Sequence, residues 1–408
     1  MKIYDDTKIY VCAPADDYTG GPLALHQLAS ALKKSGCEVY MVYFNAENSN
    51  GSPVHKNLQK FHLPFLTDFE SIEDNSRNIV IFPETRIIDF LRFSKIRIAI
   101  YWLSVGHYIR ETYSILQRIF DTDAALRFPV AVLDMAKFHD FDNLSQSEYS
   151  QQFLLFNKIS QEKIFFVGDY IEKQFIENSG SVNLESKTNI VAYNPKKGFE
   201  FTQTLIEAAP NIKFIPIENM TPKEVQNLLS RSKIYIDFGN HPGKDRIPRE
   251  SAMSHCVVIT NRRGAADNSI DIPIDDDFKF EDIPENIPAI IEKIKYVFEN
   301  FKTEHDRQNS YREIISHEQD KFFNNVDSIF KQDSKPRMNI AIAGSLQDME
   351  EICDELIHER DIEIVFAVND ELAGNIVNYN DILDLEVIST ADAEFLYNER
   401  RIDQFVVR

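Results

Sequence analysis

Apolar strands alternate with amphipathic helices along most of this chain, and no other feature restricts the fold as strongly. The first strand is expected at Lys8–Ala13, and the loop after it ends in Gly20 and Gly21. Apolar residues at i, i+3, i+4 and i+7 then predict a helix, and Glu38–Tyr43 predicts the next strand. Strands that are apolar throughout are typical of parallel sheets with helices on both faces. We therefore expect an α/β fold.

The same alternation continues along the chain. In the first half, the pattern predicts a helix at Ser145–Leu155 and further strands at Asn78–Pro83, Arg97–Leu103 and Lys163–Val167. In the second half, the expected strands are Asn189–Tyr193, Ile212–Ile217, Ile234–Phe238 and Val257–Thr260. The expected helices there are Phe199–Ala209, one opened by a capping box of Thr221 and Glu224 with proline at its first position, and Arg249–Cys256. This order indicates a second parallel α/β domain.

The length of 408 residues predicts two to three domains at about 150 residues each. We expect Rossmann-like domains at residues 1–168 and 169–332, with the boundary within 169–184, where Ser, Gly and Asn cluster. One or two helices over Pro288–Lys331 are expected to return to the first domain. A linker at 333–337 then precedes a partial α/β appendage at 338–408. Its small size favours a truncated domain over a compact appendage.

Acidic residues outnumber basic ones by 65 to 44, which gives a net charge of -21. Proteins that cover nucleic acid or an anionic membrane surface need the opposite sign of charge, so both classes are disfavoured. A small anionic ligand is still compatible, because a few local Arg and Lys side chains can outweigh the global field.

The four cysteines are widely separated, which indicates neither a zinc site nor a disulfide framework. The N-terminus has no basic stretch followed by an apolar one, so no signal peptide is expected. The longest apolar run, Ile96–Val105, is too short to span a bilayer. A cytoplasmic location follows as the expectation.

Loops that follow strands carry the candidate chemistry, because ligands of open α/β sheets bind beyond the carboxyl ends of the strands. Gly20 and Gly21 would let a ligand approach backbone N–H groups at a helix N-terminus, although they also fit a plain tight turn. Three later loops place cations at one sheet edge: Lys196, Lys197, Lys244, Arg246, Arg249, Arg262 and Arg263. Each alone could be a solvated turn, but their convergence predicts a nucleotide-type anion.

These motifs, in this order, resemble those of GT-B glycosyltransferases, and most closely the glycosyltransferase family-4-like enzymes of bacterial surface polysaccharide assembly. The resemblance covers most of residues 1–330 and is strongest from Asn189 to Ala266. It rests on the Gly-Gly loop, on Lys-Lys-Gly198 after a strand, and on Arg-Glu250 in a helix before Cys-Val-Val-Ile-Thr260. Tyr101-Trp-Leu-Ser-Val105 and Asn143-Leu-Ser-Gln-Ser-Glu148 also look like the first domain of that group. It implies two Rossmann-like domains in GT-B arrangement.

The resemblance also implies roles for individual residues. Lys197 would neutralise the departing diphosphate, and Glu250 would hold the ribose, although a first-turn helix cap is its simpler role. The donor-binding set would be Gly20, Gly21, Lys196, Lys244, Arg246, Arg249, Arg263 and Gly264. No Asp-x-Asp motif stands in a suitable loop, so neither a metal nor another cofactor is expected.

One departure from the family leaves the stereochemistry open. Retaining relatives carry a second glutamate eight positions before the one matched by Glu250, where this chain has Pro242. His241 or Asp245 could substitute for it. An inverting enzyme would instead need a general base in the cleft, for which the candidates are Asp16, Asp17 and His107.

The leading interpretation is an enzyme that moves a sugar from a nucleoside-diphosphate donor to a saccharide or lipid-linked acceptor. A lipid-linked acceptor would bring it into peripheral contact with the inner face of the membrane or with an assembly partner. Two alternatives stay open: a non-catalytic scaffold that keeps the fold, and a nucleotide-sugar epimerase. An NAD-dependent enzyme is disfavoured, because no G-x-G-x-x-G loop follows a strand.

Overall fold

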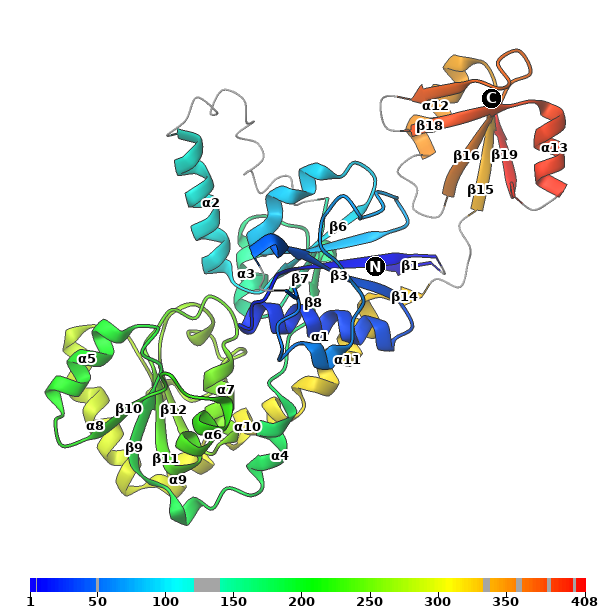
Figure 1. Ribbon diagram of the computed structural model, residues 1–408. Coiled ribbons are helices and arrows are strands. Elements are labelled where there is room, and N and C mark those ends of the chain that lie inside the picture. Colours follow the sequence, from blue (N-terminus) through cyan, green and yellow to red (C-terminus); the bar gives the residue numbers. More distant parts are fainter. Residues whose placement is uncertain are drawn as a thin grey trace.

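The computed structural model describes residues 1–4, 6–48, 51–120, 140–332, 338–356, 362–379, 383–398 and 401–408. It contains two α/β domains with all-parallel sheets, followed by a third and smaller α/β unit (Figure 1). The predicted fold class is therefore confirmed at the level of two Rossmann-like domains and a further C-terminal segment.

The first domain is built on a seven-stranded parallel sheet in the order β4-β3-β2-β5-β6-β7-β8. Its strands are β2 (Lys8–Pro14), β3 (Glu38–Phe44), β4 (Phe65–Leu66), β5 (Ile79–Pro83), β6 (Arg97–Trp102), β7 (Asp142–Ser145) and β8 (Ile164–Phe166). Its helices are α1 (Gly20–Lys34), α2 (Val105–Phe120) and α3 (Glu148–Phe156), with a 3-10 segment, η3 (Glu84–Arg92), after β5. Leu25, Leu28, Ala29 and Leu32 of α1 are buried against the sheet, as their spacing predicts.

The helix predicted at Ser145–Leu155 begins too early, because Ser145 is the last residue of β7 and pairs with Trp102 and Phe166 of the flanking strands. Helix α3 begins only at Glu148, after Ser147 caps it through the Ser150 N–H. Asp271 of the second domain adds a further cap, since its carboxylate accepts the first two N–H groups of α3 at 2.8 and 2.9 Å. The start of α3 is thus fixed by the other domain.

The second domain has a five-stranded parallel sheet in the order β10-β9-β11-β12-β13. Its strands are β9 (Thr188–Tyr193), β10 (Lys213–Pro216), β11 (Ser232–Asp237), β12 (Val257–Asn261) and β13 (Lys279–Phe280). Its first helices are α4 (Lys173–Ser179), α5 (Phe199–Ala208), α6 (Pro222–Arg231) and α7 (Arg246–Met253). The Thr221–Glu224 capping box opens α6 as predicted.

Four helices, rather than one or two, follow this sheet between residues 287 and 329. They are α8 (Ile287–Glu299), α9 (Phe301–Asp306), α10 (Asn309–Ser316) and α11 (Glu318–Ile329). Helix α11 returns to the first domain, where Phe322, Val326 and Ile329 are buried in that domain's core. After α11, the chain pairs with the N-terminus of the first domain through two parallel two-residue strands, β1 (Lys2–Ile3) and β14 (Lys331–Gln332).

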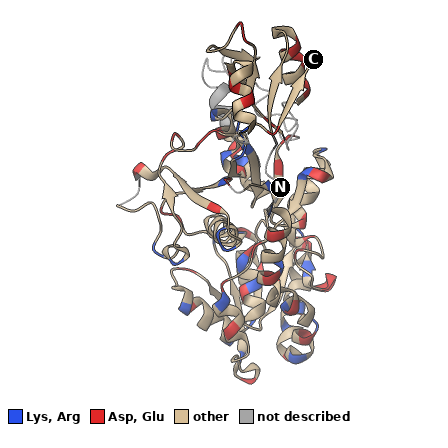
Figure 2. Ribbon diagram, turned by 90° about the vertical axis from the view of Figure 1, so that its right-hand side faces the viewer, with Lys and Arg blue, Asp and Glu red and all other residues tan. Residues whose placement is uncertain are grey.

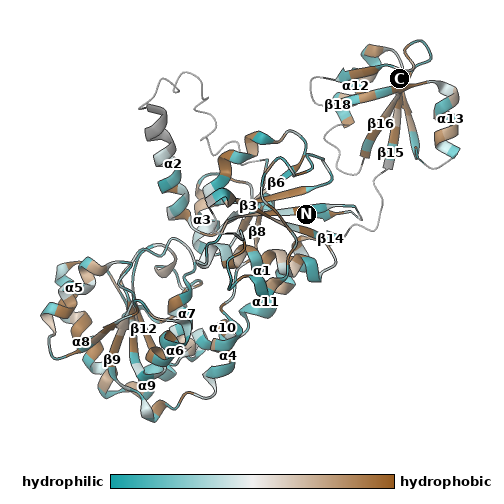
Figure 3. Ribbon diagram, viewed as in Figure 1, coloured by the Kyte–Doolittle hydropathy of each residue, from teal (hydrophilic) through white to brown (hydrophobic). Residues whose placement is uncertain are grey.

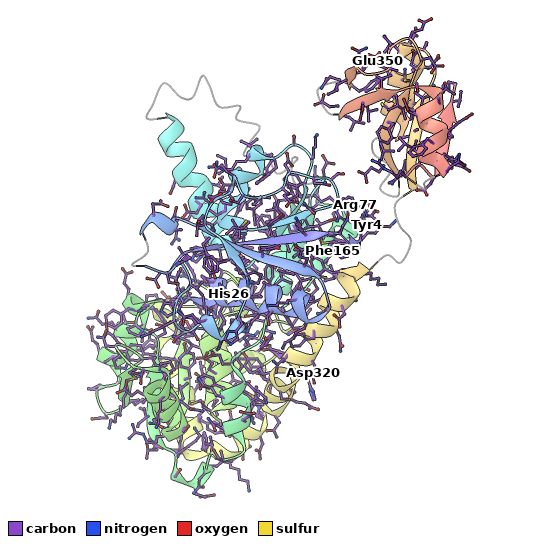
Figure 4. All side chains as sticks on the ribbon, turned by 45° about the vertical axis from the view of Figure 1, so that its right-hand side comes forward. Tyr4, His26, Arg77, Phe165, Asp320 and Glu350 are labelled. Carbon is purple, nitrogen blue, oxygen red and sulfur yellow. The ribbon has the colours of Figure 1, made fainter. Side chains whose placement is uncertain are left out.

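Residues 338–408 form a mixed five-stranded sheet in the order β17-β18-β16-β15-β19, with its own buried core. Its elements are β15 (Met338–Ala343), α12 (Leu346–Leu356), β16 (Ile362–Val368), β17 (Ile376–Tyr379), β18 (Leu383–Ile388), α13 (Thr390–Asn398) and β19 (Gln404–Val407). Tyr4 and Arg77 lie together at the edge of the first domain that faces this unit (Figure 4), and Arg77 pairs with Glu363 of β16 at 3.3 Å.

Hydrophobic residues concentrate in the central strands of each sheet (Figure 3). The two large cores follow this distribution, one around β2, β3 and β5 and the other around β9, β11 and β12. No helix among the described residues is long and apolar enough to cross a membrane.

Candidate active site

A cavity of about 550 Å³ lies between the two larger domains. Its first-domain wall comes from the segments after β2, β5, β6 and β7, and its second-domain wall from those after β9 and β11, including the start of α7. Both walls are therefore carboxyl ends of parallel strands, the position at which ligands of α/β sheets bind.

The loop after β2 presents the N-terminus of α1 to the cavity. Gly20 and Gly21 both line it, and a Cβ atom added to Gly20 would meet nothing within 4 Å. Packing therefore does not require glycine at position 20, and the backbone there stays open to a ligand. Of the two aspartates before it, half-buried Asp17 lines the cavity, whereas Asp16 is exposed and does not.

The turn after β9 carries Lys197 into the cavity. Gly198 has φ +60°, and a Cβ there would lie 2.0 Å from the Phe238 carbonyl oxygen, so only glycine allows this turn to pack against the end of β11. Lys197 lines the cavity, and its Nζ atom pairs with Asp245 at 2.7 Å. Lys196 is exposed and does not line the cavity.

A buried acid–base set lies beneath Lys197. His241 is fully buried, with Nδ1 at 3.2 Å from an Asp245 oxygen and Nε2 at 3.7 Å from an Asp237 oxygen. Burial opposes the charged imidazole, but the two carboxylates outweigh it and raise the pKa of His241. Burial likewise opposes the charged form of Asp245, yet His241 and Lys197 lower its pKa. Asp245 thus lies between two cationic groups, His241 and Lys197, and it is the partner that holds Lys197 in place.

The segment from His241 to Asp245 touches the first domain directly. The side-chain amide of Gln146 accepts from the Lys244 N–H at 2.7 Å and donates to the Lys244 carbonyl at 2.9 Å. A Cβ on Gly243 would lie 2.1 Å from the Leu103 carbonyl oxygen, so the close approach depends on glycine. The Lys244 side chain lines the cavity but pairs with Glu318 of α11.

Helix α7 begins three residues earlier than expected, at Arg246, because Pro248 fits within the first turn, where its missing N–H breaks no bond. Glu250 therefore stands in the second turn and is no first-turn cap, which corrects the expectation. It is buried and does not line the cavity, and burial raises its pKa against the opposing effect of Arg246 and Arg249. The ribose role carried over to it stays a prediction.

The seven lysines and arginines predicted to share one sheet edge do not all line the cavity. Arg246 lines the cavity, with its guanidinium 5.8 Å from the centre of the Tyr18 ring. Arg249 is fully buried and donates to Asp169 and Glu318 at 2.8 Å each. Arg262 and Arg263 do not line the cavity and pair with Asp276 and Asp282, and Gly264 packs on the His241 carbonyl oxygen. Three of the seven predicted cations thus line the cavity: Lys197, Lys244 and Arg246.

The first-domain wall adds groups of its own. His107 lies at the start of α2 and lines the cavity. Partial removal of its imidazole from water, followed by the nearby charges of Arg110 and Lys197, lowers its pKa. Sequence reasoning missed Glu84, Arg110 and Asp237, all of which line the cavity. Glu84 and Asp237 stand at the carboxyl ends of β5 and β11, so strand position alone could have indicated them.

Comparison with known proteins gives the fold its name. No protein-family model matches the chain, and no curated protein matches it. A crystal structure of Anabaena HepE in complex with UDP and glucose aligns with 79% of this chain and 98% of its own, at 10% identity and a TM-score of 0.54. Sucrose-phosphate synthase from Thermosynechococcus elongatus aligns with 79% of this chain and 100% of its own, at 10% identity and a TM-score of 0.51. The two larger domains thus have the GT-B fold, as the sequence resemblance implied.

Proposed function

We propose that the chain is a glycosyltransferase that moves a sugar from a nucleoside-diphosphate donor to a saccharide or lipid-linked glycan acceptor. The observation that carries the proposal is the placement of three cations: Lys197, Lys244 and Arg246 line the second-domain wall of the cavity, in a chain of net charge -21. Basic and acidic residues are otherwise mixed along the ribbon (Figure 2), so these cations are not part of a broad basic face. They suit a small anion.

The nature of that anion is inferred from the fold. Crystal structures of HepE contain UDP, UDP with glucose, and UDP-glucose. The cavity of about 550 Å³ is in the size range of ligand pockets. A diphosphate between Lys197 and Arg246, with its sugar toward Gly20 and Gly21, would use both walls.

The proposed chemistry is electrostatic. As the bond between the anomeric carbon and the diphosphate breaks, negative charge grows on the leaving phosphate, and Lys197 would neutralise it. Arg246 can bind phosphate oxygens with two parallel N–H groups. Asp245 keeps the Lys197 ammonium oriented before the donor arrives. Because these cations can balance the charge, the proposal includes independence from a metal.

The remaining parts of the proposal come from the sequence resemblance. They are membership of the family-4-like enzymes, a role in bacterial surface polysaccharide assembly, and a cytoplasmic site with peripheral membrane contact through a lipid-linked acceptor. An acceptor would enter from the first-domain side, which presents Asp17, Glu84 and His107 to the cavity.

The test is UDP release from UDP-glucose, with EDTA present and with saccharide or lipid-linked acceptors added in turn. We expect release by the wild-type protein and a loss of at least about tenfold in Lys197→Ala. Lys213→Ala is the matched control. That lysine is exposed and is the first residue of β10, so it lies at the amino-terminal ends of the strands, whereas the cavity lies at their carboxyl ends. Binding of UDP without release would favour a scaffold, and an epimerised sugar without transfer would favour an epimerase.

A further inference from the structure

A second cavity, of about 270 Å³, lies in the first domain beside α1, and we call it the side pocket. Three rings line it: His26 of α1, Tyr43 near the end of β3, and Phe65 of β4. Ser52 and Gln59 add a hydroxyl and an amide, and aliphatic side chains supply much of the remaining wall. The transfer chemistry proposed above uses none of these residues.

The lining of the side pocket has no acidic or strongly basic group. None of the described residues around it is Asp, Glu, Lys or Arg, although these four make up 27% of the chain. Two lysines close to its wall have other partners, since Lys33 donates to the His62 carbonyl at 2.9 Å and Lys60 pairs with Glu172. The side pocket therefore suits a neutral ligand, whereas the cavity between the domains is lined by three cations.

A buried hydrogen bond at this wall leaves one oxygen without a donor. The Nδ1 atom of His26 lies 2.6 Å from the Pro22 carbonyl, which can only accept, so Nδ1 carries the proton. Burial lowers the pKa of His26 to about 4, so at neutral pH its Nε2 atom accepts from the Tyr43 hydroxyl at 2.7 Å. Among the described residues, no group donates to the buried Tyr43 oxygen. A ligand hydroxyl would supply that donor, whereas an apolar chain would leave the oxygen unsatisfied.

The aromatic rings suit the faces of a sugar. Phe65 is 44% exposed, and its ring meets the Tyr43 ring edge-on at 5.7 Å. A sugar ring has C–H groups on its faces, which pack on aromatic rings, and hydroxyl groups at its rim, which need hydrogen-bond partners. Rings beside a hydroxyl, an amide and an acceptor oxygen meet both needs.

Two segments join the side pocket to the cavity between the domains. In the first two turns of α1, Pro22 and Leu25 line that cavity and His26 lines the side pocket (Figure 4 labels His26). The side-pocket segment after β3 also contacts the loop after β2, where the Pro53 carbonyl accepts from the Asp16 N–H at 2.8 Å. The two cavities therefore adjoin the same loop and the same helix.

We propose that the side pocket is an acceptor subsite, which binds a neutral sugar unit remote from the hydroxyl that reacts. This inference rests on the proposed function and specifies its acceptor as a neutral oligosaccharide. The reacting unit would lie in the cavity between the domains, and a later unit of the same chain would reach the side pocket past the first turns of α1.

The experiment begins with a printed array of short neutral and anionic oligosaccharides, presented to the whole protein. Glycans that the wild type retains are then titrated against Phe65→Ala and Tyr43→Phe. Phe65→Ala changes an exposed ring and leaves the pair of His26 and Tyr43 intact, so it keeps the test valid if Tyr43→Phe impairs folding. Phe395→Ala is the matched control, because that exposed ring lies on α13, outside both cavities.

We expect the wild type and Phe395→Ala to retain neutral oligosaccharides with equal affinity. Phe65→Ala and Tyr43→Phe should each bind them at least about threefold more weakly, because each loses a ring contact or a hydrogen bond. Their affinity for UDP should stay within about twofold of the wild type. With the retained glycan as acceptor, Phe65→Ala should raise KM, whereas KM for the terminal monosaccharide of that glycan should not change.

Three results would overturn the inference while UDP binding still supports the proposed transferase. They are retention of no neutral glycan by the wild type, equal affinity in Phe65→Ala and Tyr43→Phe, and an equal rise in KM for the monosaccharide, which would place the reacting unit in the side pocket. A wild-type protein that retains a neutral glycan but binds no UDP would contradict both the proposed transferase and the acceptor role of the side pocket.

Discussion

Replacing Glu84 with glutamine should make the first domain more stable, and increasingly so as the pH rises. Burial raises the pKa of this carboxyl group from 4.5 to about 8 in the folded protein. Between those values the folded protein binds one more proton than the unfolded chain, so stability falls as the pH rises. The loss is about 1.4 kcal/mol per pH unit, or roughly 3 kcal/mol at pH 7.

Glutamine keeps the size of the side chain and an oxygen for the Leu103 N–H, but it does not titrate. The difference in unfolding free energy between Glu84→Gln and the wild type should therefore grow from near zero at about pH 4.5 to roughly 3 kcal/mol at pH 7. All other titrating groups are common to both proteins and cancel in the difference.

Urea unfolding can follow this difference because Trp102 is the only tryptophan in the chain. It is fully buried in β6, and its indole N–H donates to Asn143 at 2.9 Å, so its fluorescence reports on the first domain. The dependence of the unfolding free energy on urea should be the same in both proteins. A difference in stability that does not change with pH would show that the pKa of Glu84 is not raised in the fold.

Two further substitutions test the contacts that join the domains. Arg249→Met leaves Asp169 buried without its cation and Glu318 with Lys244 alone, and it should lower stability by about 3–5 kcal/mol; an unchanged thermal midpoint would contradict a structural role for Arg249. Gly243→Ala places a methyl group 2.1 Å from the Leu103 carbonyl oxygen, so the domains should separate, and small-angle scattering should show a larger radius of gyration; unaltered scattering would show that the contact can be relieved locally.

The fold could be predicted where local patterns suffice. The apolar stripe of α1 and the Thr221 capping box need only nearby residues, and both occur as expected. Strand β7 could not be predicted this way, because three of the four residues in Asp142–Ser145 are polar. It is held in the sheet by pairing with its neighbouring strands and by a hydrogen bond from the Trp102 indole N–H to Asn143. The two strands that pair with it lie about forty positions before it and about twenty positions after it in the sequence.

The sequence indicates which loops form the cavity, but not which of their side chains line it. Lys244, Arg246 and Arg249 look alike in sequence, yet Arg249 does not line the cavity. Its guanidinium instead pairs with Asp169 and Glu318, which are 80 and 69 residues away in the sequence. Such partners become visible only when both domains are in place. Glu84 belongs to no motif, and it reaches the cavity wall only because it directly follows β5 in the folded sheet.

If Lys197 and its neighbours form a diphosphate site, calorimetric titration should detect binding of UDP. We expect UDP to bind the wild-type protein and Lys213→Ala equally. Lys197→Ala should bind at least about tenfold more weakly, since it loses a charge-assisted contact to phosphate. Absence of UDP binding by the wild type, or equal affinity in Lys197→Ala, would show that no diphosphate site exists at Lys197.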